Sequence, residues 1–382
     1  MRKNAKCVKF AVIGIGRMGS IHAHHLMKAR VKNATLSAVC DIDSNALTAF
    51  FCKHKKIPAF SDYREIMEKV EIDAVIIAVP HYFHIEIAEY FLRHNKHVLI
   101  EKPLGVDIKE AKRFLEFLEN HVGSSAAIMY NQRTNKVYKK AKQIIDNNGI
   151  GTVRRISFIV TDWYRSDAYY LNNSWRASLK GEGGGILINQ CVHQLDILTW
   201  FVGLPISICA TMSTVNRKIT TENDVTAVLE YQNGAMCSLN ASGHELRGVN
   251  RIELSGDSGR ILLGKHRAHY YSFSKSEPEV NEQTVAGYGS SDIKRKTFSY
   301  GIFRLIADAI YGQQIRVVRN FVDHILFGEE LIAPAKDGIY ALTLINGIYL
   351  SAWQNCEVRL PLDGDKYVEV FTQKREEENA NN

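Results

Sequence analysis

The 382-residue sequence has no long hydrophobic segment. No run of about 18 uncharged apolar residues occurs, and a helix needs roughly that length to cross a membrane. The N-terminal segment is basic, but it has no apolar stretch of signal-peptide length before the first glycine turn. We therefore expect a cytoplasmic protein that has no membrane partner.

Cysteine pairs of the kind that bind zinc are also lacking. The seven cysteines are an odd number without a CxxC pair, and each lies in or beside an apolar segment. This pattern favours reduced, partly buried thiols. His22, His24 and His25 lie close together, but no carboxylate or cysteine accompanies them at ligand spacing. We expect surface or packing histidines here, and no metal.

Clustered basic charge is missing as well, although the formal net charge is +7. The one dense basic run, residues 294–298, is short, whereas proteins that bind nucleic acids cluster their basic residues. We therefore expect no nucleic-acid partner. The hydrophobic fraction of 46% and the charged fraction of 23% are typical of a globular chain. The polar segment 372–382 lacks periodicity and is predicted to be disordered.

The length predicts two domains. In residues 1–128, short apolar runs alternate with helical patterns, which is typical of an α/β fold with a doubly wound parallel sheet. The predicted strands are Lys9–Gly14, Thr35–Asp41, Asp73–Val79, His97–Glu101 and Ala126–Tyr130. The predicted helices are Ser61–Lys69 with Ser61 as N-cap, His84–His94 and Asp107–His121. Ligands of such sheets bind at the carboxyl ends of the strands.

Residues 129–371 have a different pattern. In Arg155–Asp162, Ile156, Phe158 and Val160 fall on one side, as in a half-buried antiparallel strand. Further strands are predicted at Ile206–Val215, Asp224–Tyr231, Ala235–Ala241, Arg251–Ser255 and Arg260–Gly264. Helices are predicted at Asn135–Asn147, Gly185–Val202, Ile315–Phe327 and Gly338–Trp353. These elements predict an α+β domain with a large, mostly antiparallel sheet.

A glycine motif follows the first predicted strand. Gly14, Gly16 and Gly19 have the spacing that lets a pyrophosphate approach the amides of a helix N-terminus. Asp41 ends the next strand, 22 positions beyond Gly19, where a carboxylate can bind ribose hydroxyls and repel a 2′-phosphate. No Arg or Lys stands beside Asp41. The unit predicts a dinucleotide site that favours NAD over NADP.

Lys102 follows the strand predicted at His97–Glu101. An ammonium at this carboxyl end can donate a hydrogen bond to a developing alkoxide and stabilise it. A lysine at a strand end is equally often a solvated surface group, so its position alone decides nothing.

Residues 183–196 combine three glycines with a polar stripe. Asn189, His193 and Asp196 stand at i, i+4 and i+7, on one face of an otherwise apolar helix. His193 has a side chain whose ordinary pKa suits proton exchange with a carbinol at neutral pH. Asn189 can orient its ring, and Asp196 is a further candidate for assisting it. A histidine satisfied within the core is the alternative.

At these residues the chain resembles the Gfo/Idh/MocA family, from Val8 to about Leu360. The resemblance implies a Rossmann domain, a second domain whose sheet forms homodimers or homotetramers, and a catalytic pair of Lys102 and His193. It also implies cofactor contacts for Gly14, Ile15, Gly16, Arg17, Met18, Gly19, Asp41, Val79, Pro80, His81, His84, Glu101, Lys102, Asn131, Trp175 and Arg176.

The chain departs from this family's pattern at Asn189, where many members have aspartate. Asparagine keeps a hydrogen bond to the histidine but removes the charge that would raise its basicity. Some sugar-nucleotide dehydrogenases of the family are similar here. The departure does not exclude catalysis, but it weakens the case for an inositol-type substrate.

We therefore expect an NAD-dependent transfer of hydride to or from a secondary hydroxyl of a sugar, a glycoside or an inositol-like polyol. The aromatic and polar segment 162–170 suits a sugar ring, although its aromatic residues could equally pack within the fold. The expected substrate contacts are Lys102, Tyr164, Arg165, Asn189 and His193. Oxidation of a glycoside at C3 before elimination, a biosynthetic reductase and a non-catalytic dinucleotide-binding regulator remain alternatives. An intact pair of Lys102 and His193 argues against the regulator.

Overall fold

The computed structural model describes residues 7–171, 175–284, 287–301, 305–308 and 312–380. The chain divides into two compact units. Unit 1 comprises residues 1–131 and 310–342, and unit 2 comprises residues 132–309 and 343–382. Among the described residues, no helix is both long enough and apolar enough to span a membrane.

Unit 1 contains a six-stranded parallel sheet in the order β3-β2-β1-β4-β5-β6. This is the strand order of doubly wound dinucleotide-binding folds, and it confirms the predicted fold class. Strands buried on both faces require near-continuous apolar sequence, which is why these strands were visible in the sequence. The strands are β1 (Val8–Ile13), β2 (Ala34–Cys40), β3 (Ala59–Phe60), β4 (Ala74–Ile77), β5 (His97–Ile100) and β6 (Ala126–Ile128).

The helices of unit 1 differ in part from the prediction. Helix α2 and strand β3 were not predicted, because neither has a clear apolar period. The helix predicted from Ser61 begins only at Arg64, so Ser61 is not its N-cap. Asp107 caps α5 by accepting a hydrogen bond from the Glu110 N–H group. The helices are α1 (Arg17–Met27), α2 (Ser44–Lys53), α3 (Arg64–Lys69), α4 (His84–Arg93), α5 (Ile108–Asn120) and α11 (Gln314–Phe327).

Helix α11 returns to unit 1 from late in the chain. Its Phe321 and Val322 are buried in the core of unit 1, and the Phe321 ring centroid lies 6.3 Å from that of Phe10 on β1. The predicted single domain over 129–371 is therefore wrong for the segment 310–342. The apolar stripe of α11 must be buried, and it packs against β1 and β5. A local sequence pattern cannot indicate this packing.

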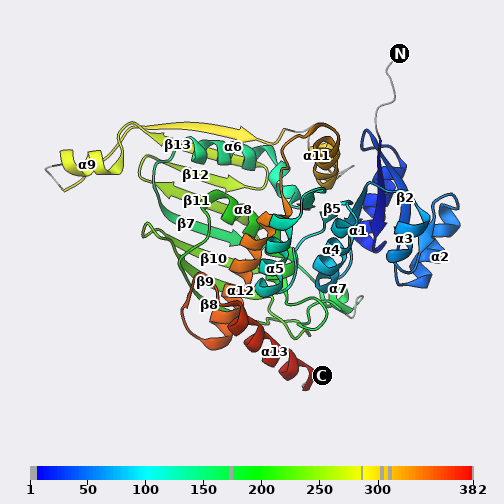
Figure 1. The fold of residues 1–382 in the computed structure, drawn as a ribbon. Helices are drawn as coiled ribbons and strands as arrows, with labels where there is room; N and C mark the ends of the chain where they lie inside the picture. The colour runs from blue at the N-terminus through cyan, green and yellow to red at the C-terminus, as the bar shows by residue number, and fades with distance from the viewer. Residues whose placement is uncertain (1–6, 172–174, 285–286, 302–304, 309–311, 381–382) are drawn as a thin grey trace, which may run out of the picture. The chain divides into compact units, whose positions relative to one another are not determined.

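Unit 2 contains a nine-stranded, mostly antiparallel sheet, as the sequence predicted. Figure 1 shows most of its strands in the order β14-β13-β12-β11-β7-β10-β9-β8-β15. The pairing of β7 with β10 is parallel, and the other neighbouring pairs are antiparallel. The strands are β7 (Val153–Val160), β8 (Ser207–Ser213), β9 (Asp224–Glu230), β10 (Met236–Ser242), β11 (Asn250–Gly256), β12 (Gly259–Gly264), β13 (Arg267–Phe273), β14 (Ile293–Ser299) and β15 (Val358–Arg359).

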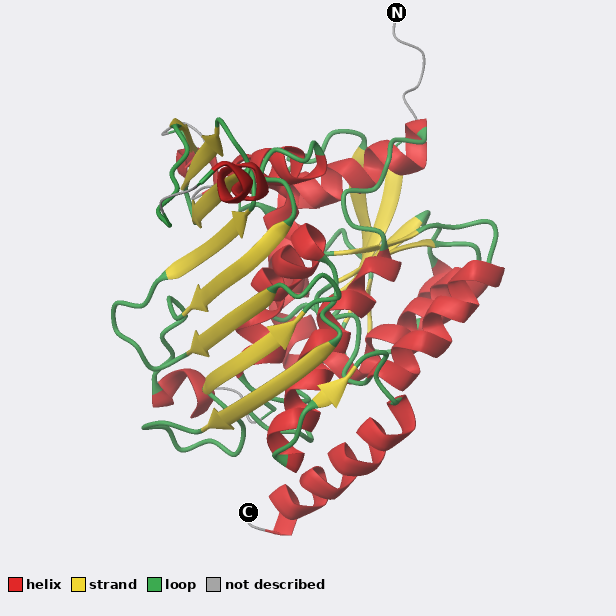
Figure 2. Cartoon of the chain, turned by 90° about the vertical axis from the view of Figure 1, so that its left-hand side faces the viewer, coloured by secondary structure: helices red, strands yellow, loops and turns green. Residues whose placement is uncertain are grey.

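One face of this sheet is covered and the other is open. Along β9, Val225, Ala227 and Leu229 are buried while the alternate residues are mostly exposed. Figure 2 shows the open face toward the viewer, with helices behind the strands. Strand β14 was not predicted because its side chains are almost all exposed and no apolar alternation marks it. The helices of unit 2 include α6 (Lys136–Asp146), α7 (Asp167–Leu171), α8 (Val192–Val202), α9 (Glu277–Gln283) and α13 (Gly364–Ala380); α12 (Gly338–Gln354) begins in unit 1 and continues into unit 2.

The predicted disorder is wrong for residues 372–380, because helix α13 continues to Ala380. Residues 381–382 lie outside the described residues. In α13, Glu378 is only 8% exposed. The Glu378 carboxylate accepts hydrogen bonds from the N–H groups of Leu179 (2.9 Å) and Lys180 (3.2 Å) and from the Thr220 hydroxyl. One buried glutamate within a run of charged residues forms no recognisable local pattern, so this contact could not be predicted from the sequence.

We predict that Glu378→Ala lowers the free energy of unfolding by about 1–3 kcal/mol, because it removes the acceptor of several buried donors. The matched control is Glu376→Ala, an exposed residue of the same helix, which should change stability by less than about 0.5 kcal/mol. Denaturant unfolding of the three proteins checks this. Equal losses in both variants would contradict it.

Candidate active site

The glycine turn after β1 has the geometry of an anion site. Gly14 has φ of 85°, and a Cβ atom there would collide with the carbonyl oxygen of Ala78. The N-cap of α1, Gly16, provides no side-chain hydrogen bond to the first turn, and a Cβ at Gly16 would meet only open space. Ligand atoms can therefore approach the N–H groups of the first turn of α1.

Asp41 lies directly beside this turn. Its carboxylate accepts hydrogen bonds from the N–H groups of Ile15 (2.7 Å) and Asp43 (2.9 Å). The structure therefore brings the acidic residue and the glycine turn together, as their spacing predicted. In dinucleotide-binding sheets, a carboxylate in this position binds the ribose hydroxyls.

The carboxyl ends of four strands meet at one edge of the sheet. The N–H groups of Gly14, Ala78 and Glu101 donate to carbonyl oxygens at the ends of the neighbouring strands β2, β1 and β4. The glycine turn, Asp41, the Val79–His81 segment and Lys102 therefore all lie at this edge. Asn131 follows β6 in the short helix η2 (Asn131–Thr134).

His84 holds two of these loops together. It is fully buried, and its ring nitrogens contact the carbonyl oxygens of Pro103 (2.7 Å) and Val79 (2.9 Å). Burial lowers the pKa of His84, although the two carbonyl contacts oppose this shift. The described geometry gives His84 the role of a bridge between the loop after β4 and the turn after β5.

Glu101 has a partner that the sequence did not indicate. His22 on α1 is buried, and its Nε2 lies 2.8 Å from the Glu101 carboxylate. His22 is thus one of the expected packing histidines, but it pairs with the residue that precedes Lys102. The two residues are 79 positions apart, so no local pattern could reveal the contact.

In unit 2, the helix that carries His193 begins with a π-helical turn, η3 (Leu187–Cys191), and continues as α8. A regular α-helix was predicted here, and π-turns are frequent at functional sites. Within residues 186–199 every residue is buried except Asn189 and His193, which are half-buried. The two side chains lie one turn apart on the same side of the helix, as predicted.

Asp196, one turn further along the helix, has a partner that the sequence did not indicate. It is 1% exposed and forms a bidentate ion pair with Arg133, with N–O distances of 2.6 and 3.0 Å. A buried guanidinium requires a carboxylate, and Asp196 satisfies it. This ion pair connects α8 to the segment that follows Asn131. That Asp196 assists His193 stays a prediction.

Asn189 donates a hydrogen bond from its side-chain amide to Glu182, a residue that sequence reasoning missed. Glu182 is 2% exposed, and its other oxygen accepts from the Ala177 N–H group at 2.7 Å. Arg176 lies 3.5 Å from Glu182 and donates to the Tyr169 hydroxyl at 2.6 Å. The only sequence signal for this network was a glutamate inside the glycine-rich turn.

Glu222 is a second buried carboxylate that the sequence did not indicate. It accepts hydrogen bonds from the N–H groups of Gly185 (3.0 Å) and Leu187 (3.1 Å) and from the Tyr349 hydroxyl (2.8 Å). Burial raises the pKa of Glu222 to about 7, and the hydrogen bonds partly offset this. A Cβ at Gly185 would collide with the Glu222 carbonyl oxygen, which explains a glycine of the triplet.

The two other expected substrate contacts lie in the segment before α7. The Arg165 guanidinium stacks over the rings of Trp163 (5.3 Å) and Tyr169 (4.7 Å). Tyr164 is 39% exposed, and Arg217 stacks over its ring at 5.0 Å. The segment therefore presents aromatic and cationic groups side by side.

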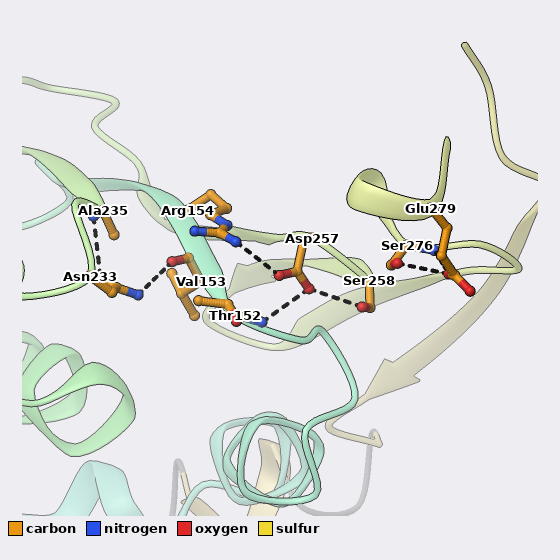
Figure 3. A network of polar contacts seen from close by, with 9 residues as sticks. All are labelled: Thr152, Val153, Arg154, Asn233, Ala235, Asp257, Ser258, Ser276 and Glu279. Atoms are coloured by element: carbon orange, nitrogen blue, oxygen red, sulfur yellow. Dashed lines mark hydrogen bonds and ion pairs between the residues drawn. The ribbon is translucent and has the colours of Figure 1, made fainter. Parts of the chain in front are cut away.

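A small cavity of about 210 Å³ also lies in unit 2. Its lining residues are Thr152, Val153, Ile156, Phe201, Val202, Tyr231, Asn233 and Ala235. Figure 3 shows a polar network that includes some of these residues: Asn233 donates to the Val153 carbonyl oxygen, and Asp257 accepts from the Thr152 N–H group and pairs with Arg154. Val202 is about 14 Å along α8 from His193. No predicted site residue lines this cavity.

Comparisons with known proteins agree with this geometry. A model of an oxidoreductase family with an NAD-binding Rossmann fold matches residues 8–124, and a GFO/IDH/MocA C-terminal domain model matches residues 138–262. Together the matched ranges cover more than half of the chain. The protein is thus an oxidoreductase with an NAD-binding Rossmann domain. It belongs to the GFO/IDH/MocA family.

Several relatives span almost the whole chain. Myo-inositol 2-dehydrogenase of Thermotoga maritima is 25% identical over 88% of this chain and 94% of its own length. Inositol 2-dehydrogenase of Rhizobium meliloti is 23% identical over 92% and 99%. The WlbA dehydrogenase of Bordetella pertussis, solved with NADH and UDP-GlcNAcA, has a TM-score of 0.80 at 23% identity and covers 94% and 99% of the two chains. The last comparison shows the shared fold.

The raised pKa of Glu222 predicts a pH dependence of stability. Between the ordinary carboxyl pKa of 4.5 and about 7, the folded state binds more protons than the unfolded state. The free energy of unfolding therefore falls as pH rises through this interval, by on the order of 3 kcal/mol, and levels off above it. Glu222→Gln should remove this fall. Urea unfolding at pH 5 and pH 8 checks it, and an equally steep fall in the variant would contradict it.

Proposed function

We propose that this protein is an NAD-dependent dehydrogenase that acts on a secondary hydroxyl of a sugar, a glycoside or an inositol-like polyol. The observation that carries the proposal is the position of Lys102 at the carboxyl edge of the dinucleotide-binding sheet. The names of two relatives, which are inositol 2-dehydrogenases, support the substrate class.

The residues of unit 1 fit NAD. The open N-terminus of α1 suits a pyrophosphate, and Asp41 suits unphosphorylated ribose hydroxyls while repelling a 2′-phosphate. NAD, when bound, supplies the nicotinamide ring that accepts the hydride. The remaining cofactor contacts that we propose are Ile15, Arg17, Met18, Gly19, Val79, Pro80, His81, His84, Glu101, Asn131, Trp175 and Arg176.

In the oxidation, His193 takes the proton of the substrate hydroxyl as the hydride leaves the carbinol carbon. The Lys102 ammonium donates a hydrogen bond to the same oxygen and stabilises the charge that develops on it. The carbinol becomes a carbonyl. In the reduction His193 returns the proton, and Lys102 again donates a hydrogen bond to the oxygen. Asn189, Tyr164 and Arg165 bind the rest of the substrate.

We further propose that the protein is a cytoplasmic homo-oligomer that uses the open face of the nine-stranded sheet. On this face Val228 is 44% exposed and Met236 is 40% exposed. A second copy of the chain would remove such apolar surface from water, which supports association through this face.

We predict that Lys102→Met leaves NAD affinity largely unchanged and lowers turnover by about two or more orders of magnitude, as is typical when a charge-stabilising group is lost. The substrate comes from screening inositols, free sugars and glycosides for NAD reduction, and calorimetry measures NAD binding. Lys112→Met, an exposed lysine of α5, is the matched control and should turn over normally. Unchanged turnover in the Lys102 variant would remove this residue from the mechanism.

We also predict that the unmodified protein binds NAD more tightly than NADP and that Asp41→Ala narrows this gap. Asp41 also accepts a hydrogen bond from the Ile15 N–H group, so Asp41→Ala should lower the affinities for both NAD and NADP. The informative quantity is the ratio of these two affinities. Asp43→Ala, which removes a neighbouring exposed carboxylate, should leave the ratio unchanged. Calorimetry measures all four affinities. A preference for NADP in the unmodified protein would refute the role of Asp41.

A further inference from the structure

The guanidinium of Arg165 has one nitrogen with an acceptor and one edge without. Its Nη1 donates a hydrogen bond to the Tyr164 carbonyl oxygen at 2.9 Å. Its Nε is buried, and among the residues that the structure describes no atom accepts a hydrogen bond from it. Within the same residues, Nη2 has no acceptor either. A buried donor without an acceptor is unfavourable, so the edge formed by Nε and Nη2 requires an explanation.

Arg133 shows what the same edge of an arginine binds in this protein. Its Nε and Nη2 donate to the Asp196 carboxylate at 3.0 and 2.6 Å. Two oxygens of a carboxylate or a phosphate match the spacing of these two nitrogens, and the charge strengthens both hydrogen bonds. The corresponding edge of Arg165 therefore has the geometry for a carboxylate or a phosphate.

Aromatic rings hold the Arg165 guanidinium in place. It stacks over Trp163 at 5.3 Å and over Tyr169 at 4.7 Å from the ring centroids. Stacking uses the face of the planar group and leaves its N–H groups available at the edges. The Tyr169 hydroxyl accepts from the Gln190 amide at 3.1 Å, and Gln190 belongs to η3, which continues into the helix of His193. The stacked arginine is thus connected to that helix within unit 2.

Arg217 brings a second positive charge to this place. Its Nε donates to the Arg165 carbonyl oxygen, and its guanidinium stacks over the Tyr164 ring at 5.0 Å. Burial raises the pKa of Tyr170 to about 12, and the charges of both arginines oppose this shift, so both lie near its hydroxyl. In the described part of the chain, neither arginine forms an ion pair with a carboxylate. Two neighbouring cations repel each other, and an anion between them removes this repulsion.

We infer that the Nε–Nη2 edge of Arg165 binds an anionic group of the substrate, a carboxylate or a phosphate, while Arg217 supplies a second positive charge. The substrate is then an acid or a phosphate ester of the sugar or polyol class, and this assignment rests on the proposed function. Lys265 does not contribute in the same way, because its ammonium pairs with Asp162 at 3.6 Å and its charge is already balanced.

The kinetic test compares three matched compounds. They are a neutral sugar or polyol, its counterpart with a carboxylate and its counterpart with a phosphate, each group placed away from the reacting carbinol. The unmodified enzyme should favour one anionic counterpart over the neutral compound in kcat/KM by about tenfold or more, the effect of hydrogen bonds to a charged group. The preferred counterpart distinguishes carboxylate from phosphate. Equal or better turnover of the neutral compound would overturn the inference.

Two variants of Arg165 separate charge from geometry. Arg165→Lys keeps the charge but cannot bind two oxygens side by side, and Arg165→Gln loses both properties. The preference for the anionic compound should narrow in Arg165→Lys and disappear in Arg165→Gln. The change should lie mainly in KM, because the anion is remote from the reacting carbinol, and the neutral compound should be turned over nearly as before.

Lys218→Gln is the matched control, because it removes an exposed positive charge from the residue next to Arg217. It should leave the preference unchanged. An unchanged preference in Arg165→Gln would contradict the inference. An equal narrowing in Lys218→Gln would also contradict it, since the preference would then reflect the general positive charge of this region.

A second measurement needs no turnover. In protein labelled with ¹⁵N-arginine, the Nε–H signal of Arg165 is the one missing from Arg165→Lys. Acetate or inorganic phosphate should shift this signal in a saturable way, whereas chloride at the same ionic strength should not. A signal that neither anion moves, or that chloride moves equally, overturns the inference. If no compound reduces NAD, the proposed function fails, and this titration still decides whether Arg165 binds an anion.

Discussion

The turn that precedes the helix of His193 depends on carboxylates that accept hydrogen bonds from backbone N–H groups. Residues 177–187 are largely buried without forming a sheet or a regular helix, so their N–H groups require other acceptors. Glu182 accepts from Ala177, Glu378 accepts from Leu179 and Lys180, and Glu222 accepts from Gly185 and Leu187. Glu182 belongs to the turn itself, whereas Glu222 and Glu378 come from distant parts of the chain. Their agreement fixes where the π-turn starts and hence where Asn189 and His193 lie.

Unit 1 applies the same principle to its glycine turn. Asp41 accepts a hydrogen bond from the Ile15 N–H group. The carboxylate proposed to bind the ribose therefore also stabilises the glycine turn proposed to bind the pyrophosphate. Glu101 is held by His22 of the helix that begins at this turn. Lys102, which we propose as a catalytic residue, therefore follows a carboxylate that is anchored to α1, so one helix supports both proposed functions.

The sequence predicted what depends on short-range pattern. The buried strands of unit 1 are continuous apolar runs, and the strands β7 to β12 alternate, so each could be located within a few residues. The glycine spacing placed Asp41 beside the turn, and the i, i+4 spacing placed Asn189 and His193 together. Strand β14 was not predicted, because its exposed, charged side chains form no such pattern.

The partners of the site residues could not be predicted in this way. Asp196 pairs with Arg133, 63 positions away, and His22 pairs with Glu101, 79 positions away. Such contacts arise only when the fold brings distant segments together. A polar stripe therefore indicated which residues share a helix face, but it could not indicate which carboxylate each residue would meet.

The return of α11 has a consequence for the order of folding during synthesis. A ribosome releases the six strands of unit 1 within the first 128 residues, but the helix that covers Phe10 arrives only with residues 314–327. All strands of unit 2 except β15 emerge in between. The apolar surface of the nascent parallel sheet therefore stays exposed while the second sheet is synthesised. Chains with exposed apolar surface are prone to aggregate. The chain order thus makes completion of the cofactor-binding core a late event in the life of the nascent protein.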